Sequence, residues 1–89
     1  MVIMMVGLRK LILLVLDVDG AQSIKELEEK LKRMCEELGK GFSIAQLYAR
    51  LSELRRDGLI EKEGDRYCIT ELGEEKLYSW ISEGEAYED

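Results

Sequence analysis

Two polar side chains on one predicted helix offer the most specific chemistry in this sequence. Gln46 and Arg50 are four residues apart, a spacing that places both on one side of a helix. Glutamine can form paired hydrogen bonds to the edge of adenine, and arginine can do the same with guanine. Ala45 and Ala49 also face outward in this helix and would let it approach the floor of a groove. The pattern favours recognition of bases over catalysis.

Side chains that can bind phosphates flank this pair. Lys40 precedes the helix, Ser43 begins it, and the following hairpin adds two more basic residues. The predicted DNA-binding residues are Lys40, Ser43, Gln46, Arg50, Arg55, Arg56, Lys62 and Arg66. The alternative is that these are ordinary solubilising side chains. Glu53 on the same helix supports that alternative, because phosphates repel a carboxylate.

Residues that serve catalysis or metal binding are scarce. The chain has no histidine, and its two cysteines, Cys35 and Cys68, lack the partners that a metal site needs. There is no glycine-rich phosphate loop, and no base accompanies Cys35 in the sequence pattern. We expect no cofactor, no metal and no enzymatic activity. The cysteines are expected to be reduced thiols of a cytoplasmic protein, with a disulfide as the alternative.

The charge is distributed unevenly along the chain. The 89 residues carry a formal charge of -6, with 46% apolar and 36% charged residues, which indicates one soluble globular domain. Residues 40–60 hold four basic and two acidic side chains, whereas residues 71–89 hold one basic and seven acidic ones. The local field matters more to docking than the total charge. Because the basic excess is small, we expect DNA recognition to require a two-fold dimer.

The apolar N-terminal segment predicts a helix over residues 4–17. Arg9 and Lys10 interrupt its apolar run and Asp17 follows, so the segment fits neither a membrane span nor a signal peptide. A helix this apolar has more to bury than one small core can take, so we expect it to form a subunit contact as well. The predicted dimer interface combines it with the apolar edge of the last helix: Leu8, Ile12, Val15, Leu77, Trp80 and Ile81.

Two amphipathic helices are predicted next. Ser23 and Glu26 have the spacing of a capping box, and Gly39 suits a left-handed end of the second helix. The third helix begins at Ser43, and Gly58 provides a similar end. Its buried stripe is predicted to be Ile44, Leu47, Leu51 and Leu54, which leaves Gln46 and Arg50 facing outward.

The pattern then changes from a helical period to a period of two. Gly64-Asp65 suits a two-residue hairpin turn. The resulting register pairs Ile60 with Ile69, Lys62 with Tyr67, and Glu63 with Arg66 as an opposite-charge pair. Thr70 is expected to cap a last helix. Residues 1–83 are thus predicted to form one domain, and residues 84–89 an acidic, frayed tail.

Three helices, a hairpin and a closing helix are the order of a winged helix-turn-helix, an α+β fold that is mostly α. The sequence resembles PadR-like transcriptional regulators, and MarR-like ones next, through Tyr48, Leu51, Leu54, Asp57, Gly58, Leu59, Ile60, Tyr67, Ile69, Thr70, Gly73 and Leu77. The resemblance implies a winged-helix fold in which the third helix reads a DNA groove. The closing helix is shorter than the dimerising helix that such relatives often carry.

These observations lead to two expectations about function. The first is a homodimeric regulator that binds a palindromic site in double-stranded DNA through residues 43–57. The second is the same fold acting as a protein-interaction module in a larger assembly, without DNA binding. The acidic balance, Glu53 and the very apolar first helix favour the second.

Overall fold

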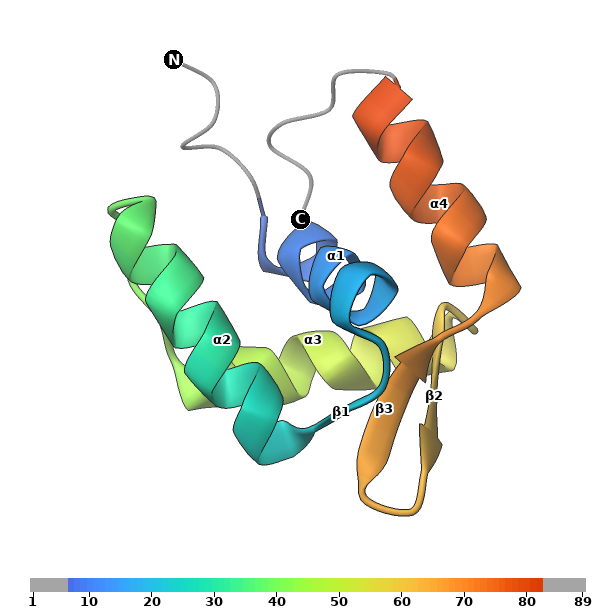
Figure 1. The fold of residues 1–89 in the computed structure, drawn as a ribbon, viewed down its shortest axis with the longest axis horizontal. Helices are drawn as coiled ribbons and strands as arrows, with labels where there is room; N and C mark the ends of the chain where they lie inside the picture. The colour runs from blue at the N-terminus through green and yellow to red at the C-terminus, as the bar shows by residue number, and fades with distance from the viewer. Residues whose placement is uncertain (1–6, 83–89) are drawn as a thin grey trace.

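Three helices precede a β-hairpin and a fourth follows it in the computed structural model, which describes residues 7–82 (Figure 1). The helices are α1 (Leu8–Asp19), α2 (Ile24–Glu37), α3 (Ile44–Arg56) and α4 (Glu71–Ser82). The hairpin strands are β2 (Ile60–Glu63) and β3 (Arg66–Ile69). The predicted order of elements is therefore confirmed, while the predicted acidic tail and the first residues of the predicted first helix lie outside the described residues.

A short strand that the sequence analysis missed joins the hairpin. β1 (Gln22–Ser23) pairs antiparallel with β3, which makes a three-stranded sheet in the order β1-β3-β2. The predicted two-stranded wing is thus corrected to a sheet whose third strand comes from the segment between α1 and α2. The wing is attached to the helical part of the molecule by backbone pairing at this point.

Helix α1 lies at the centre of the fold, with the other helices arranged around it (Figure 1). Its long apolar arc explains this position, because a helix that is apolar on most sides is buried on most sides. Apolar side chains from every helix, from β2 and β3, and from the residue before β2 complete the core. Its buried members include Ile12, Leu13 and Leu16 of α1, Leu27 and Leu31 of α2, Leu47, Leu51 and Leu54 of α3, Leu59, Ile60, Tyr67 and Leu77.

The ends of α2 and α3 follow the predicted capping signals. Ser23 and Glu26 form the complete capping box at the start of α2. Gly39 and Gly58 have positive φ angles of 73° and 78°, the left-handed conformation that glycine adopts without strain. After Gly58 the chain folds back, and the amide of Leu59 donates to the carbonyl of Leu54 over 2.9 Å. This return brings the chain directly into β2.

The hairpin has the predicted register. Ile60 pairs with Ile69, Lys62 with Tyr67, and Glu63 with Arg66. Gly64 has the positive φ that the tight turn requires. The predicted pairing of Glu63 and Arg66 holds for the backbone only, because the Arg66 guanidinium turns to β1 and α2.

Thr70 and Gly73 fix the start of α4 against the end of α3. The Thr70 hydroxyl donates to the carbonyl of Gly58 over 2.7 Å and accepts from the amide of Gly73 over 3.0 Å, which confirms the predicted cap. A Cβ atom at Gly73 would collide with the carbonyl oxygen of Leu59. The absence of a side chain at this position therefore lets the two backbones touch.

Among residues 7–82, none of the helices combines the length and the apolar character needed to cross a membrane.

Candidate nucleic-acid interface

Helix α3 turns one face into the core and the opposite face outward. Leu47, Leu51 and Leu54 are buried, as predicted, but Ile44 is 39% exposed. The prediction that Ile44 closes the buried stripe is therefore wrong. Ile44 lies in the first turn of the helix, where the neighbouring elements no longer cover the edge of the stripe. The outward face consists of Ala45, Gln46, Ala49, Ser52, Arg55 and Arg56.

The hairpin lies at the C-terminal end of α3 and projects past it (Figure 1). Its tip extends away from the side of the molecule where α1 begins and α4 ends. The helix and the hairpin therefore occupy one side of the molecule. A helix beside a projecting hairpin has the dimensions to enter a major groove while the hairpin reaches the adjacent backbone.

Gln46 keeps its amide in solvent. Ser43 caps α3 by accepting from the backbone amide of Gln46 over 3.4 Å, a long hydrogen bond. In contrast to Glu26 of α2, the side chain of Gln46 does not complete a capping box. The predicted outward orientation of Gln46 is matched by its exposure.

Arg50 lies at the edge of the outward face instead of its centre. Its side chain is 27% exposed, and its Nη2 atom lies 3.5 Å from Oε2 of Glu53. Arg9 of α1 approaches the other oxygen of Glu53, with 3.9 Å between Nη1 and Oε1. Glu53 therefore lies between two guanidinium groups, which offset the repulsion that this carboxylate would exert on a phosphate. The ion pair with Glu53 directs one side of the Arg50 guanidinium along the helix instead of outward.

The two arginines in the last turn of α3 are the most accessible cations of the helix. Arg55 is exposed, and Arg56 keeps most of its side chain in solvent although its Nε atom lies 3.4 Å from Oδ1 of Asp57. Their position at the C-terminus of the helix is favourable, because the helix dipole is negative there. Lys40, in the turn before α3, is half-buried.

The hairpin carries charges of both signs. Lys62 of β2 is exposed and lies over the ring of Tyr67, with 5.6 Å between Nζ and the ring centroid. Glu61, Glu63 and Asp65 are exposed on the same hairpin. Arg66 has its guanidinium group directed at Ala21 and Glu26, so it does not extend from the tip of the wing. Arg66 is exposed as well, but its guanidinium is engaged, so Lys62 is the better placed hairpin cation for a phosphate contact.

The two thiols are free, and their surroundings raise the pKa of both. Cys35 is buried in the core, and burial raises its pKa. Partial burial also raises the pKa of Cys68, and the carboxylates of Glu63 and Glu61 raise it further. Both thiols therefore stay protonated at neutral pH, where the thiolate is the reactive form. Within residues 7–82, no three His, Cys, Asp or Glu side chains are grouped so that they could hold a metal ion.

The residues predicted for a dimer interface lie mostly inside the protomer. Ile12 and Leu77 are 0% exposed, and Leu8, Val15 and Trp80 are also buried. Only Ile81 remains exposed, together with two apolar side chains that were not predicted, Val18 of α1 and Tyr78 of α4. The amphipathic pattern identified apolar faces correctly but could not show that α1 and α4 cover each other's face.

Tyr48 and Ser52 are exposed side chains on α3 that the site prediction left out. Tyr48 is 53% exposed and follows the buried Leu47 directly, so it lies on the flank of the helix opposite to Arg50. The same rotation of 100° per residue that placed Gln46 outward would have placed Tyr48 outward as well.

Comparison with solved structures identifies the fold. The chain superimposes on PadR of Bacillus subtilis with a TM-score of 0.74 and 24% sequence identity, over 83% of the present chain. The present chain spans about 40% of the length of that protein. No family model matches the chain, and no curated protein matches it in sequence. The predicted PadR-like winged-helix fold is thereby confirmed.

Proposed function

We propose that the protein binds double-stranded DNA as a winged-helix transcriptional regulator, with the outward face of α3 in the major groove. The observation that carries this proposal is the composition of that face. Ala45, Ala49 and Ser52 are small and exposed, so base edges can come close to the helix. Gln46 lies beside them with an amide that can bind adenine.

Charge at the C-terminal end of α3 supports the same orientation. Arg55 and Arg56 are exposed next to the hairpin, where they can bind the phosphates that border the groove. Lys62 of the hairpin supplies a further contact on the same side. Arg50 is a weaker candidate than its sequence position indicated, because Glu53 holds it.

The DNA-binding form is proposed to be a homodimer, because one copy offers few phosphate contacts. The hydroxyl of Tyr78 lies 3.1 Å and 3.2 Å from the two carboxylate oxygens of Asp17, which joins α4 to the end of α1. Val18 and Ile81, next to this junction, are exposed apolar side chains. Covering them with a second copy would remove apolar surface from water.

A second candidate function is a protein-interaction module. It is favoured by the three exposed carboxylates of the hairpin and by the exposed Ile44 and Tyr48 on α3. Such a module would use the same surface for an apolar or basic partner. The two functions make opposite predictions for the replacement of arginines by neutral residues: DNA binding should weaken, whereas binding of an apolar or basic partner should not.

The test is fluorescence anisotropy with fragments of genomic DNA at several salt concentrations, together with the mass in solution from light scattering. Replacing Arg55 and Arg56 by Gln should weaken binding at least about tenfold at low salt and reduce the slope of log K against log salt by about four, since the dimer loses two cations from each copy. The matched control replaces Lys32 and Arg33 of α2 by Gln, which removes the same charge from another exposed site.

Sequence-selective binding that is sensitive to the α3 arginines and insensitive to the α2 pair would support the proposal. Absence of binding at low salt, or equal loss for both pairs, would count against it.

In the same samples the mass should be that of a dimer. Replacing Val18 and Ile81 by Glu should convert it to a monomer, since two carboxylates would then lie in the contact.

A further inference from the structure

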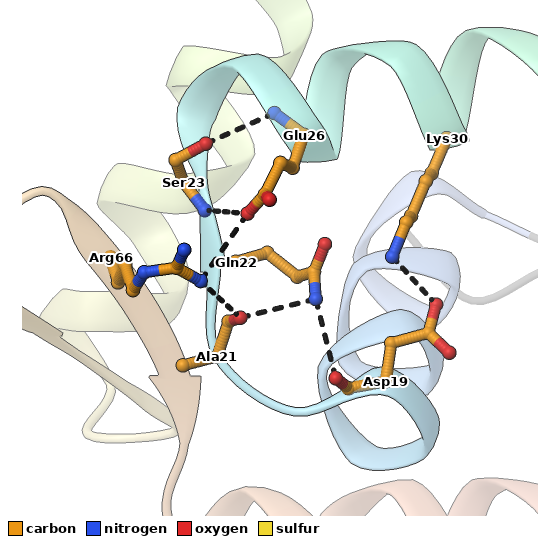
Figure 2. A network of polar contacts seen from close by, with 7 residues as sticks. All are labelled: Asp19, Ala21, Gln22, Ser23, Glu26, Lys30 and Arg66. Atoms are coloured by element: carbon orange, nitrogen blue, oxygen red, sulfur yellow. Dashed lines mark hydrogen bonds and ion pairs between the residues drawn. The ribbon is translucent and has the colours of Figure 1, made fainter.

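A network of polar contacts joins the wing to the segment between α1 and α2 (Figure 2). Arg66, the first residue of β3, reaches across to this segment. Its Nη1 atom donates to the carbonyl of Ala21 over 3.0 Å and lies 3.4 Å from Oε1 of Glu26. One guanidinium nitrogen therefore binds both a backbone carbonyl and the carboxylate of Glu26 in the first turn of α2.

The carboxylate that Arg66 contacts already has a structural role. Oε1 of Glu26 accepts the backbone amide of Ser23 over 2.9 Å, and the hydroxyl of Ser23 accepts the amide of Glu26 over 3.2 Å. The pKa of Glu26 lies below its usual value, chiefly because the Ser23 amide donates to it, and Arg66 lowers it further. The wing is thus bound to the capping box of α2 through a shared oxygen.

The other acceptor, the Ala21 carbonyl, is held in place as well. The Nε2 atom of Gln22 donates to it over 3.1 Å and to the carbonyl of Asp19 over 3.3 Å. Gln22 is only 6% exposed, so this amide is fixed by burial. Lys30 of α2 pairs with Asp19 over 3.0 Å on the far side of the junction. Arg66 therefore binds a carbonyl group that hydrogen bonds within the helical part of the molecule already hold in place.

We propose that Arg66 is a positioning residue, which sets the angle of the wing relative to α2 and α3. Backbone pairing of β3 with β1 spans two residues only, Gln22 with Tyr67 and Ser23 with Arg66. A hairpin with four-residue strands is marginally stable alone, so a side-chain contact next to its turn, at the end far from α3 and α4, can restrain its orientation. The expected effect on DNA affinity rests on the proposed function, whereas the expected effect on the orientation of the wing does not.

This role differs from the phosphate contact that the sequence predicted for Arg66. A phosphate contact would add a released counterion to the salt dependence, whereas a positioning residue would not. The two roles also differ at Glu26. Removing a carboxylate should strengthen DNA binding or leave it unchanged if Arg66 is thereby freed for a phosphate, but it should weaken binding if the pair orients the wing.

The first experiment measures amide hydrogen exchange of the full chain without DNA. The variants are Arg66→Gln, Glu26→Gln and the double variant, with Glu29→Gln, at an exposed site on α2, as the control. Glutamine at position 26 can still accept the Ser23 amide, so the capping box is retained. Exchange of the amides of residues 22–23 and 66–69 should be faster in all three variants and unchanged in the control. Unchanged exchange in Arg66→Gln and Glu26→Gln would overturn the proposal.

The second experiment repeats the salt titration of DNA binding with the same proteins. Each single variant should bind about two- to fivefold more weakly, the range expected for an exposed ion pair, and the double variant no more weakly than either. The salt slope should stay at the wild-type value. A slope reduced by about two in Arg66→Gln, one for each copy in the dimer, with tighter binding by Glu26→Gln, would assign Arg66 to a phosphate instead. If the wild type binds no DNA, the proposed function fails and the exchange data alone decide the role of Arg66.

Discussion

Helices α2 and α3 begin with the same motif and use it differently. In α2 the motif is Ser23 with Glu26, and in α3 it is Ser43 with Gln46. Both serines cap their helix, but only Glu26 turns back to the backbone amide of its serine. Glu26 also binds Arg66, whereas Gln46 remains exposed to solvent.

This difference separates a helix that holds the structure together from a helix that presents a surface. The polar groups at the start of α2 are engaged with β1, β3 and the end of α1 (Figure 2). The outward polar groups of α3 are free to exchange water for a ligand only where no carboxylate holds them, which favours Gln46 and Arg55 over Arg50. A count of basic residues does not show this distinction.

The largest expected effect tests whether the two helices contribute equally to the core. Leu27 of α2 and Leu51 of α3 are both buried. Replacing either by Ala should lower the free energy of unfolding by about 2–5 kcal/mol, since each removal leaves a cavity. Urea denaturation measures the loss. The exposed neighbours provide controls, because Lys32→Ala and Ser52→Ala should stay within about 0.5 kcal/mol of the wild type.

A smaller effect should distinguish the two caps. Ser23→Ala removes a hydrogen bond of 3.2 Å from a complete capping box, and we expect a loss of about 1 kcal/mol. Ser43→Ala removes a single bond of 3.4 Å, and we expect about 0.5 kcal/mol. Thermal or urea unfolding of the two variants under identical conditions gives the comparison. Equal losses would show that the complete box adds nothing to stability.

The smallest effect on stability is expected for Gln46→Glu. A carboxylate in the first turn of α3 is favoured by the helix dipole, so stability should rise by about 0.3 kcal/mol at this exposed site. DNA binding should fall at the same time, because the amide that can bind adenine is replaced by a group that phosphates repel. Unfolding and anisotropy measurements on one preparation test both halves. A variant that gains stability without losing DNA affinity would remove Gln46 from the proposed interface.

Local sequence signals predicted most of the fold. The capping box of Ser23 and Glu26, the left-handed Gly58 and the turn at Gly64 depend on residues close in the chain, and the structure shows all three. The missed strand β1 depends on a partner more than 40 residues away, Ser23 with Arg66. Such a pairing leaves no local pattern in two residues.

The candidate site was less predictable because its geometry depends on neighbours in space. Helical spacing correctly indicated that Gln46 faces outward, and it also places Glu53 within reach of Arg50 three residues earlier, but it could not show that Glu26 would hold Arg66. It also could not show that Ile12 and Leu77 would be buried within one protomer instead of between two. Directions of side chains follow from the sequence period, whereas their partners follow from tertiary packing.

The contact of Gly73 with the carbonyl of Leu59 has a consequence for how this chain can vary. The angle between α4 and the end of α3 is set there by direct contact between two backbone segments. The hydrogen bond from the Thr70 hydroxyl to the Gly58 carbonyl holds the same two segments together. Any side chain at position 73 would push these two main-chain segments apart, so a replacement there should change the angle between the helices as well as the packing.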